Sequence, residues 1–153
     1  MTLDEQSTMS PDETDTLLAR HETGVLTLAR DDEPYAIPIS YGYDAGERQF
    51  YLRLVSTPES EKRRFLASEP ESRLVVYEED GDVYRSVVAT GQLQEIPREE
   101  LTVEHIEQYG EAKRPLFEIW GQGKHDLDIA LYRLDPGQLQ GRRIEVDRDD
   151  GTT

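Results

Sequence analysis

Three consecutive cations, Lys62, Arg63 and Arg64, are the residues of this sequence whose types and spacing most readily support chemistry. They follow Thr57-Pro58, where a threonine N-cap and a proline at the first helical position predict that a helix begins. Free backbone N–H groups at a helix start, with cationic side chains nearby, favour an anion such as a phosphate. A second interpretation stays open, in which the cations pair with carboxylates on an exposed helix face. Those carboxylates belong to Glu59, Glu61 and Glu69.

The strand expected over residues 49–55 leads directly toward that helix. Positions 50, 52 and 54 are apolar and form the core-facing set, so Tyr51 and Arg53 share the opposite face. We therefore expect Arg53 to point away from the core, into a cleft near the helix start. Ser56 and Thr57 follow at the same place and join the candidate anion site.

Strict alternation over residues 35–43 predicts a strand with large side chains on one face and small ones on the other. Pro38 cannot donate a ladder hydrogen bond, so it marks an edge or a bulge. Ser40 and Gly42 leave their face thin, which would let a flat ring lie against backbone groups. An edge strand whose small residues only suit its neighbours explains the same pattern equally well.

The remaining elements complete an antiparallel pattern. Ser10, Pro11 and Glu13 form a helix start with a capping box, and Gly24 is expected to end that helix. Long alternating strands need a nearly closed sheet to protect their edges, so we predict a mainly β fold, a small β-barrel with flanking helices. One domain over residues 10–146 is expected, with flexible termini at 1–9 and 147–153. Further strands are expected over residues 25–29, 72–79, 83–96, 127–134 and 138–146, and further helices over 57–68 and 97–109.

The chain of 153 residues is strongly acidic, with 33 Asp and Glu against 17 Lys and Arg and a net charge of −16. Such a surface repels nucleic acid and anionic lipid, so we expect neither as a partner. Dispersed acid, few lysines and no cysteine resemble proteins of salt-loving microbes, and this interpretation is favoured over that of an ordinary acidic protein. No apolar stretch is long enough to span a bilayer and no secretory signal is apparent, so a cytoplasmic protein is expected.

Taken in order, these segments resemble the pyridoxamine-5′-phosphate-oxidase-like FMN-binding split barrels, and most closely their nitroimidazole-reductase-like branch. Residues 34–43 look like the strand that contacts the isoalloxazine and ribityl groups, and residues 50–53 look like the next strand. Lys62, followed by Phe65-Leu66 and Pro70, matches the helix whose basic residue holds the FMN phosphate. Two later segments, residues 84–91 and 131–134, are also similar.

The resemblance implies a Greek-key antiparallel split barrel that forms a homodimer, with FMN at the subunit interface and a small molecule as substrate. Trp120 is the candidate for a stacking residue from the later segment, although a core tryptophan is an equal reading. The cofactor-binding candidates are Pro38, Ile39, Ser40, Tyr41, Tyr51, Arg53, Ser56, Thr57, Lys62, Arg63, Ser86 and Trp120.

Two departures bear on the reaction. The related proteins commonly carry a histidine where Arg53 stands, and their connection to the basic residue is about two residues shorter, with a glycine instead of Glu59-Ser60-Glu61. The drug-reducing activity of that branch is therefore not expected, and no catalytic residue is assigned. A flavin-dependent oxidoreductase is favoured because the cofactor itself performs the chemistry.

Other cofactors and roles stay open. A non-catalytic protein that stores or senses flavin, or binds haem, would use the same barrel, and a deazaflavin would fit it too. The three histidines are far apart in sequence, so no metal site is predicted. Those histidines are His21, His105 and His125.

Overall fold

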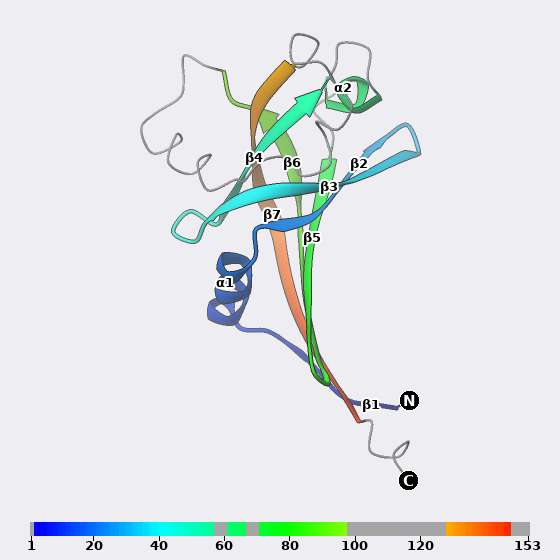
Figure 1. Cartoon of the computed structure of the whole chain (residues 1–153), viewed down its shortest axis with the longest axis vertical. Helices are drawn as coiled ribbons and strands as arrows, with labels where there is room; N and C mark the ends of the chain where they lie inside the picture. Colours follow the sequence, from blue (N-terminus) through cyan, green and yellow to red (C-terminus); the bar gives the residue numbers. More distant parts are fainter. Residues whose placement is uncertain (1, 57–60, 67–70, 98–127, 148–153) are drawn as a thin grey trace.

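The computed structural model describes residues 2–56, 61–66, 71–97 and 128–147, drawn as coloured ribbon in Figure 1. Within these ranges the chain forms seven strands and two helices, and no helix is both long and apolar enough to cross a membrane. The elements are β1 (Thr2–Thr8), α1 (Pro11–Arg20), β2 (Thr23–Arg30), β3 (Glu33–Asp44), β4 (Gln49–Ser56), α2 (Glu61–Leu66), β5 (Glu71–Asp80), β6 (Val83–Glu95) and β7 (Asp128–Asp147).

The strands form one antiparallel sheet in the order β1-β7-β4-β3-β2-β5-β6, and β6 also pairs with β7. This second pairing closes six strands into a barrel, and β1 extends the sheet along the end of β7. The predicted mainly β barrel with flanking helices is confirmed. Closure matters physically because it gives most strands a hydrogen-bonding partner on both sides.

The barrel interior is filled by the side chains that the alternation predicted. Phe50, Leu52 and Leu54 are at most 1% exposed, and Tyr41 lies against them with its ring edge on Phe50. Burial raises the pKa of the Tyr41 phenol, with a smaller contribution from nearby Glu22, so the hydroxyl keeps its proton. That hydroxyl donates to the Leu18 carbonyl at 2.8 Å and ties β3 to the helix α1.

Helix α1 begins as the sequence predicts. The Ser10 hydroxyl accepts from the Glu13 N–H at 3.2 Å, and the Glu13 carboxylate accepts from the Ser10 N–H at 3.3 Å. The helix ends earlier than expected, at Arg20, and Gly24 lies inside β2 instead. A side chain at Gly24 would come within 2.8 Å of the Val75 carbonyl oxygen, so this glycine serves the close approach of β5 and not a helix end.

Two further expectations differ from the structure. Residues 2–8, expected to be loose, form β1 and pair with β7. The two strands expected over 127–134 and 138–146 are one continuous strand, β7, that runs through Pro136. A register shift beside Gly91 accommodates the proline, and a side chain at Gly91 would lie 2.5 Å from the Asp135 carbonyl oxygen. The bulge therefore replaces the break that proline suggested.

Candidate functional site

Strands β3 and β4 part from each other halfway along the barrel. They pair only where Tyr41–Asp44 meets Gln49–Leu52. Beyond that point β4 continues beside β7, whereas β3 continues beside β2 toward the hairpin that joins them (Figure 1). Among the described strands, none pairs with the other edge of β3 between Glu33 and Ser40. We call this stretch the open edge of β3.

The prolines of β3 face the open edge. The Tyr41 N–H donates to the Glu22 carbonyl at 2.9 Å, so the odd-numbered residues of β3 form its hydrogen bonds with β2. Pro34 and Pro38 are even-numbered and direct their backbone groups the other way. Their missing N–H groups therefore cost the β2–β3 ladder nothing. Pro38 is an edge residue, as the sequence predicted, and Ser40 lies beside it on the same edge.

Four of the predicted site residues share the outer face of the barrel around this edge: Pro38, Ser40, Tyr51 and Arg53. Gly42 pairs with Tyr51, which places the small residues of β3 and the polar residues of β4 on one side of the sheet. Tyr51 is only 4% exposed and contacts Ile96 and Leu131 outside the main core. Ile39 and Tyr41 instead direct their side chains into the core, and their backbone groups face β2, so neither presents a polar group at this edge.

Helix α2, which carries Lys62 and Arg63, is packed against the start of β3. The Phe65 ring is fully buried and stacks on Tyr35, with ring centroids 5.4 Å apart. The exposed Arg64 approaches Glu33 of the β2–β3 hairpin at 3.9 Å, and the side chains of Glu59, Glu61 and Glu69 lie outside the described part of the chain. The backbone of Lys62 and Arg63 is helical, as predicted. Thr57 and Trp120 lie outside the described residues, and so does the helix expected over 97–109.

Ser86 is not brought to the same place. It lies on the outer face of β6, and strands β2 and β5 separate it from β3. Its cross-strand neighbours are Tyr77 on β5 and Arg142 on β7. Ser86 therefore belongs to a different part of the outer face, and the structure does not unite it with Ser40 or Arg53.

The sequence reasoning missed Arg133. This residue lies on β7 directly opposite Tyr51, and its neighbours Tyr132 and Leu134 are buried in the core. Its Nε atom is buried and has no hydrogen-bond partner among the described residues. The apolar-polar-apolar pattern of residues 132–134 would have placed Arg133 on the outer face, beside Arg53, had the pairing of β4 with β7 been known.

Charge is distributed unevenly between the two faces of the sheet. Of the ten arginines whose side chains are described, six have a carboxylate within 4.0 Å. The other four all project from the outer face, and no described carboxylate pairs with them. We call these four the outer-face arginines: Arg53, Arg73, Arg133 and Arg142.

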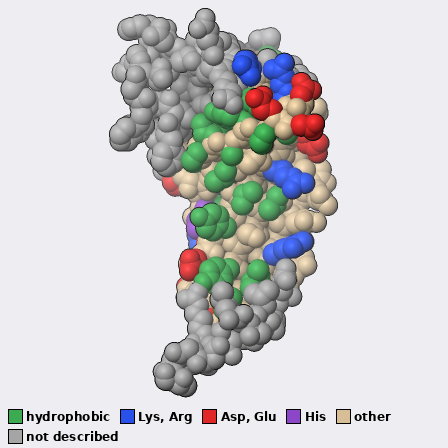
Figure 2. Space-filling view, turned by 90° about the vertical axis from the view of Figure 1, so that its right-hand side faces the viewer, with side chains coloured by type: hydrophobic (Ala, Val, Ile, Leu, Met, Phe, Trp, Pro, Cys, Tyr) green, Lys and Arg blue, Asp and Glu red, His purple; other side chains and the backbone are tan. Residues whose placement is uncertain are grey.

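Figure 2 views the side on which Figure 1 draws β5 and the β2–β3 hairpin, and hydrophobic side chains gather over much of it.

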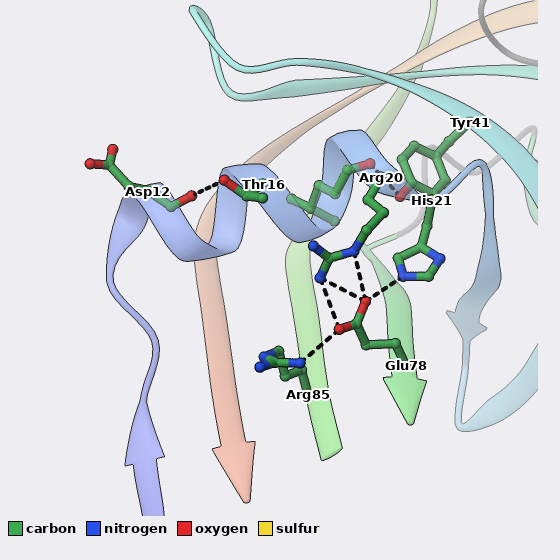
Figure 3. A network of polar contacts seen from close by, with 8 residues as sticks. Asp12, Thr16, Arg20, His21, Tyr41, Glu78 and Arg85 are labelled. Atoms are coloured by element: carbon green, nitrogen blue, oxygen red, sulfur yellow. Dashed lines mark hydrogen bonds and ion pairs between the residues drawn. The ribbon is translucent and has the colours of Figure 1, made fainter. Parts of the chain in front are cut away.

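A second polar region surrounds Glu78 on the other side of the sheet, where α1 crosses β5 and β6 (Figure 3). Arg20 binds both carboxylate oxygens at 2.8 Å, His21 Nε2 lies 2.7 Å from Oε1, and Arg85 donates to Oε2 at 2.9 Å. These residues line an open hollow of about 670 Å³. Burial alone would raise the pKa of Glu78, but the hydrogen bonds from His21, Arg20 and Arg85 outweigh it and lower the pKa to about 2.

We call this group the Glu78 cluster. Its carboxylate is ionised at neutral pH and saturated with donors, so it is not available as a general base. Among the residues with described positions, no group of three or more His, Cys, Asp or Glu could hold a metal ion. The cluster therefore attaches α1 to the barrel, and the open edge of β3 is the better candidate for a ligand site.

Comparison with known proteins identifies the family of this fold. Residues 10–143 match the family described as pyridoxamine 5′-phosphate oxidase. An uncharacterized protein of Rhizobium meliloti is 34% identical over 90 residues, which cover 58% of this chain and only 56% of that relative.

Solved structures share the fold. A FAD-binding protein of Mesorhizobium loti has a TM-score of 0.69 and 21% identity, over 93% of this chain and 98% of that one. A candidate 5-nitroimidazole antibiotic resistance protein of Bacteroides thetaiotaomicron has a TM-score of 0.65 and 13% identity, over 94% and 91%. A haem-binding protein of Mycobacterium smegmatis has a TM-score of 0.62 and 16% identity, over 86% of this chain and 52% of that one. With its closed antiparallel barrel and a match over residues 10–143, the chain belongs to the pyridoxamine 5′-phosphate oxidase-like family of flavin-binding split barrels.

Proposed function

We propose that this protein binds FMN on the outer face of its barrel, beside the open edge of β3, and works as a flavin-dependent oxidoreductase on a small molecule. The observation that carries the proposal is the parting of β3 and β4, which leaves the backbone carbonyl of Pro38 at an edge that no described strand pairs, beside the face that carries Arg53. A flat ring system with polar edges suits such a strand edge, because it can pair with backbone groups and stack on a thin face.

The residues fit a flavin phosphate as well as the ring. Lys62 and Arg63 would hold the phosphate together with Ser56 and Thr57 at the end of β4. The strand edge at Pro38 and Ser40 would contact the ring, Arg53 would face its pyrimidine edge or the phosphate, and Trp120 would stack on it. Lys62 and Arg63 belong to a helix that is anchored by the buried Phe65, so its position relative to β3 is fixed by packing.

The flavin supplies hydride or electron transfer when it is bound, and this chain supplies binding and orientation. Tyr51 is an example of how the protein contributes to binding and orientation. Its hydroxyl is 3.2 Å from the Gln49 side chain and its ring is nearly buried, so it forms a rigid, water-poor floor beside Arg53. Such a floor strengthens electrostatic contacts to a bound anion because local screening is weak.

We also propose a homodimer with the flavin near the interface, in a cell interior of high salt content. Support comes from the outer face, where Tyr77 is 69% exposed and Val25, Val75 and Val88 are only partly buried. Apolar side chains beside arginines that have no described carboxylate partner suit a protein partner and an anionic cofactor better than they suit water. Size measurement at several protein concentrations, in high salt, tests this part of the proposal.

The central test is the absorption spectrum of freshly purified protein, followed by FMN titration of two variants. Lys62→Ala should weaken FMN binding by about 1.5–3 kcal/mol, the range for a hydrogen bond to a charged group. Arg64→Ala is the matched control, because it lies on the same helix but approaches Glu33. A sample that stays colourless after incubation with FMN, or two variants with equal affinities, would contradict the proposal.

The alternative function is a non-catalytic flavin or haem carrier on the same barrel. It is favoured by one observation, the shared fold of the haem-binding protein of Mycobacterium smegmatis. A Soret band in place of flavin bands would support haem, and mass spectrometry of the released cofactor would separate FMN from FAD or a deazaflavin. Oxidation of NAD(P)H under turnover would then separate an enzyme from a carrier.

A further inference from the structure

Arg133 places a guanidinium group where the described residues offer its Nε atom no hydrogen-bond acceptor and no carboxylate partner. Its side chain is only partly exposed, and Nε is buried without a hydrogen-bond partner. Buried donors in native proteins are almost always satisfied, so a buried Nε–H without an acceptor in the described chain calls for an acceptor from elsewhere. The nearest carboxylate along the strand, Asp135, is exposed and forms no ion pair with Arg133 among the described contacts.

Arg53 lies within reach of the same place. It pairs with Leu131 on β7, and Tyr51 pairs with Arg133, so the two arginines occupy diagonal positions across β4 and β7 on one face of the sheet. Diagonal neighbours on one face lie about 7–8 Å apart at their backbones, well within the length of two arginine side chains. Both guanidinium groups can therefore approach one ligand group from two sides.

The side chains beside these two arginines are mostly apolar and little exposed to solvent. Tyr51 is 4% and Ile96 is 8% exposed, and Leu131 packs against them. Low local polarity strengthens each hydrogen bond from a guanidinium to an oxyanion. Two forked donors above an apolar floor suit a planar carboxylate or a phosphate, which accept paired hydrogen bonds.

We propose that Arg53 and Arg133 form an oxyanion site that binds a carboxylate or phosphate group of the substrate, so that the protein acts on small anionic molecules. The inference rests on the proposed function, because it places the substrate beside the flavin at the open edge of β3. It adds Arg133, and it gives Arg53 a role in selecting the substrate in addition to any contact with the cofactor.

The test measures binding of inorganic phosphate and of benzoate at constant chloride, by calorimetry with the flavin-free protein and by the flavin absorption change with the FMN-loaded protein. The variants Arg133→Gln and Arg53→Gln are each expected to weaken anion binding about 10- to 100-fold, the loss of one charge-assisted hydrogen bond. Arg133→Met, which keeps the apolar stem, should behave in the same way and guards against a folding defect.

Arg142→Gln is the matched control. Arg142 lies on the same strand and the same face, also without a carboxylate partner, but nine residues from Arg133, or about 30 Å along an extended strand. Its replacement should leave anion binding unchanged.

Two results would overturn the proposal. The first is unchanged phosphate and benzoate affinity in Arg133→Gln and Arg53→Gln. The second is a loss of FMN affinity in Arg133→Gln as large as that in Lys62→Ala, which would assign Arg133 to the cofactor phosphate. Failure of the proposed function would look different, because a protein that binds no flavin would still report its anion affinity by calorimetry.

Discussion

Two groups of arginines, one on each face of the barrel sheet, show different uses of the same side chain. In the Glu78 cluster, Arg20 and Arg85 share one carboxylate with His21, and every oxygen lone pair has a donor close by. On the outer face, Arg53 and Arg133 lie among tyrosine, serine, glutamine and apolar residues, with no described carboxylate in contact. Among the described residues, the arginines of the first group have a carboxylate partner and those of the second have none.

The contrast is informative because carboxylates are abundant. The chain has 33 acidic residues for 17 basic ones, so a partner could have been supplied at almost any surface arginine. The side chains opposite the outer-face arginines are instead neutral: Tyr51 for Arg133, Leu131 for Arg53, Ser86 for Arg142. The lack of a described acid beside these arginines, in so acidic a chain, is the reason for proposing a function on the outer face.

The largest effect is expected for Glu78→Gln. This change leaves two arginines and a histidine around a neutral amide, and we expect a loss of about 2 kcal/mol of unfolding free energy, below the 3–5 kcal/mol of fully buried pairs because Arg20 is half exposed. Urea unfolding at neutral pH measures it.

Glu78 should also account for part of the loss of stability at low pH. The pKa of Glu78 is about 2 in the folded chain against an ordinary 4.5, so its contribution is present above pH 4.5 and is lost as the pH falls toward 2. Glu78→Gln should therefore flatten the stability profile between about pH 5 and pH 2. An unaltered acid limb would assign that limb to other carboxylates.

A smaller loss is expected for Arg85→Gln, and a smaller one still for Arg20→Gln. The Arg85 side chain is 25% exposed and that of Arg20 is 49% exposed, so solvent screens the second more strongly. We expect about 1 kcal/mol for Arg85→Gln and about half of that for Arg20→Gln. Unfolding free energies of the two single variants and the double variant would measure their coupling through Glu78.

The smallest effect on stability is expected for Arg142→Gln, within about 0.5 kcal/mol, because no ion pair is lost. If Arg142→Gln cost as much as Arg85→Gln at a concentration where the protein is monomeric, the distinction between the two groups would be wrong. Arg142→Glu sharpens the comparison further. We expect it to shift the protein toward the monomer in size measurements, since it places a carboxylate on the proposed interface.

Much of the fold could be predicted from local sequence patterns. The capping box at Ser10 was evident from three residues, because a helix start depends on groups only three positions apart. The inward side of β4 followed from alternation, since successive strand residues must point to opposite faces. The resemblance of residues 10–96 to a known family then named the architecture, which the barrel closure confirms.

The pairing register of the strands could not be predicted from local patterns. The extent of β7 through Pro136 depends on a bulge beside Gly91, some 45 residues earlier in the chain, and the strand β1 forms only because the end of β7 offers it an edge. The Glu78 cluster likewise joins groups 57 and 58 residues apart. Contacts between residues so far apart in the chain cannot be predicted from the spacing of neighbouring residues.

The sequence by itself determined which side chains turn inward, where α1 begins, and that Arg53 points away from the core, because these depend on the period of a strand or the first turn of a helix. Only the tertiary structure decided that Arg133 stands beside Tyr51 and Arg53, and that β3 parts from β4 at Ser40, beyond which no described strand pairs with that edge of β3. Those facts depend on which strands pair and in what register, and pairing energy is shared by many residues that lie far apart in the chain.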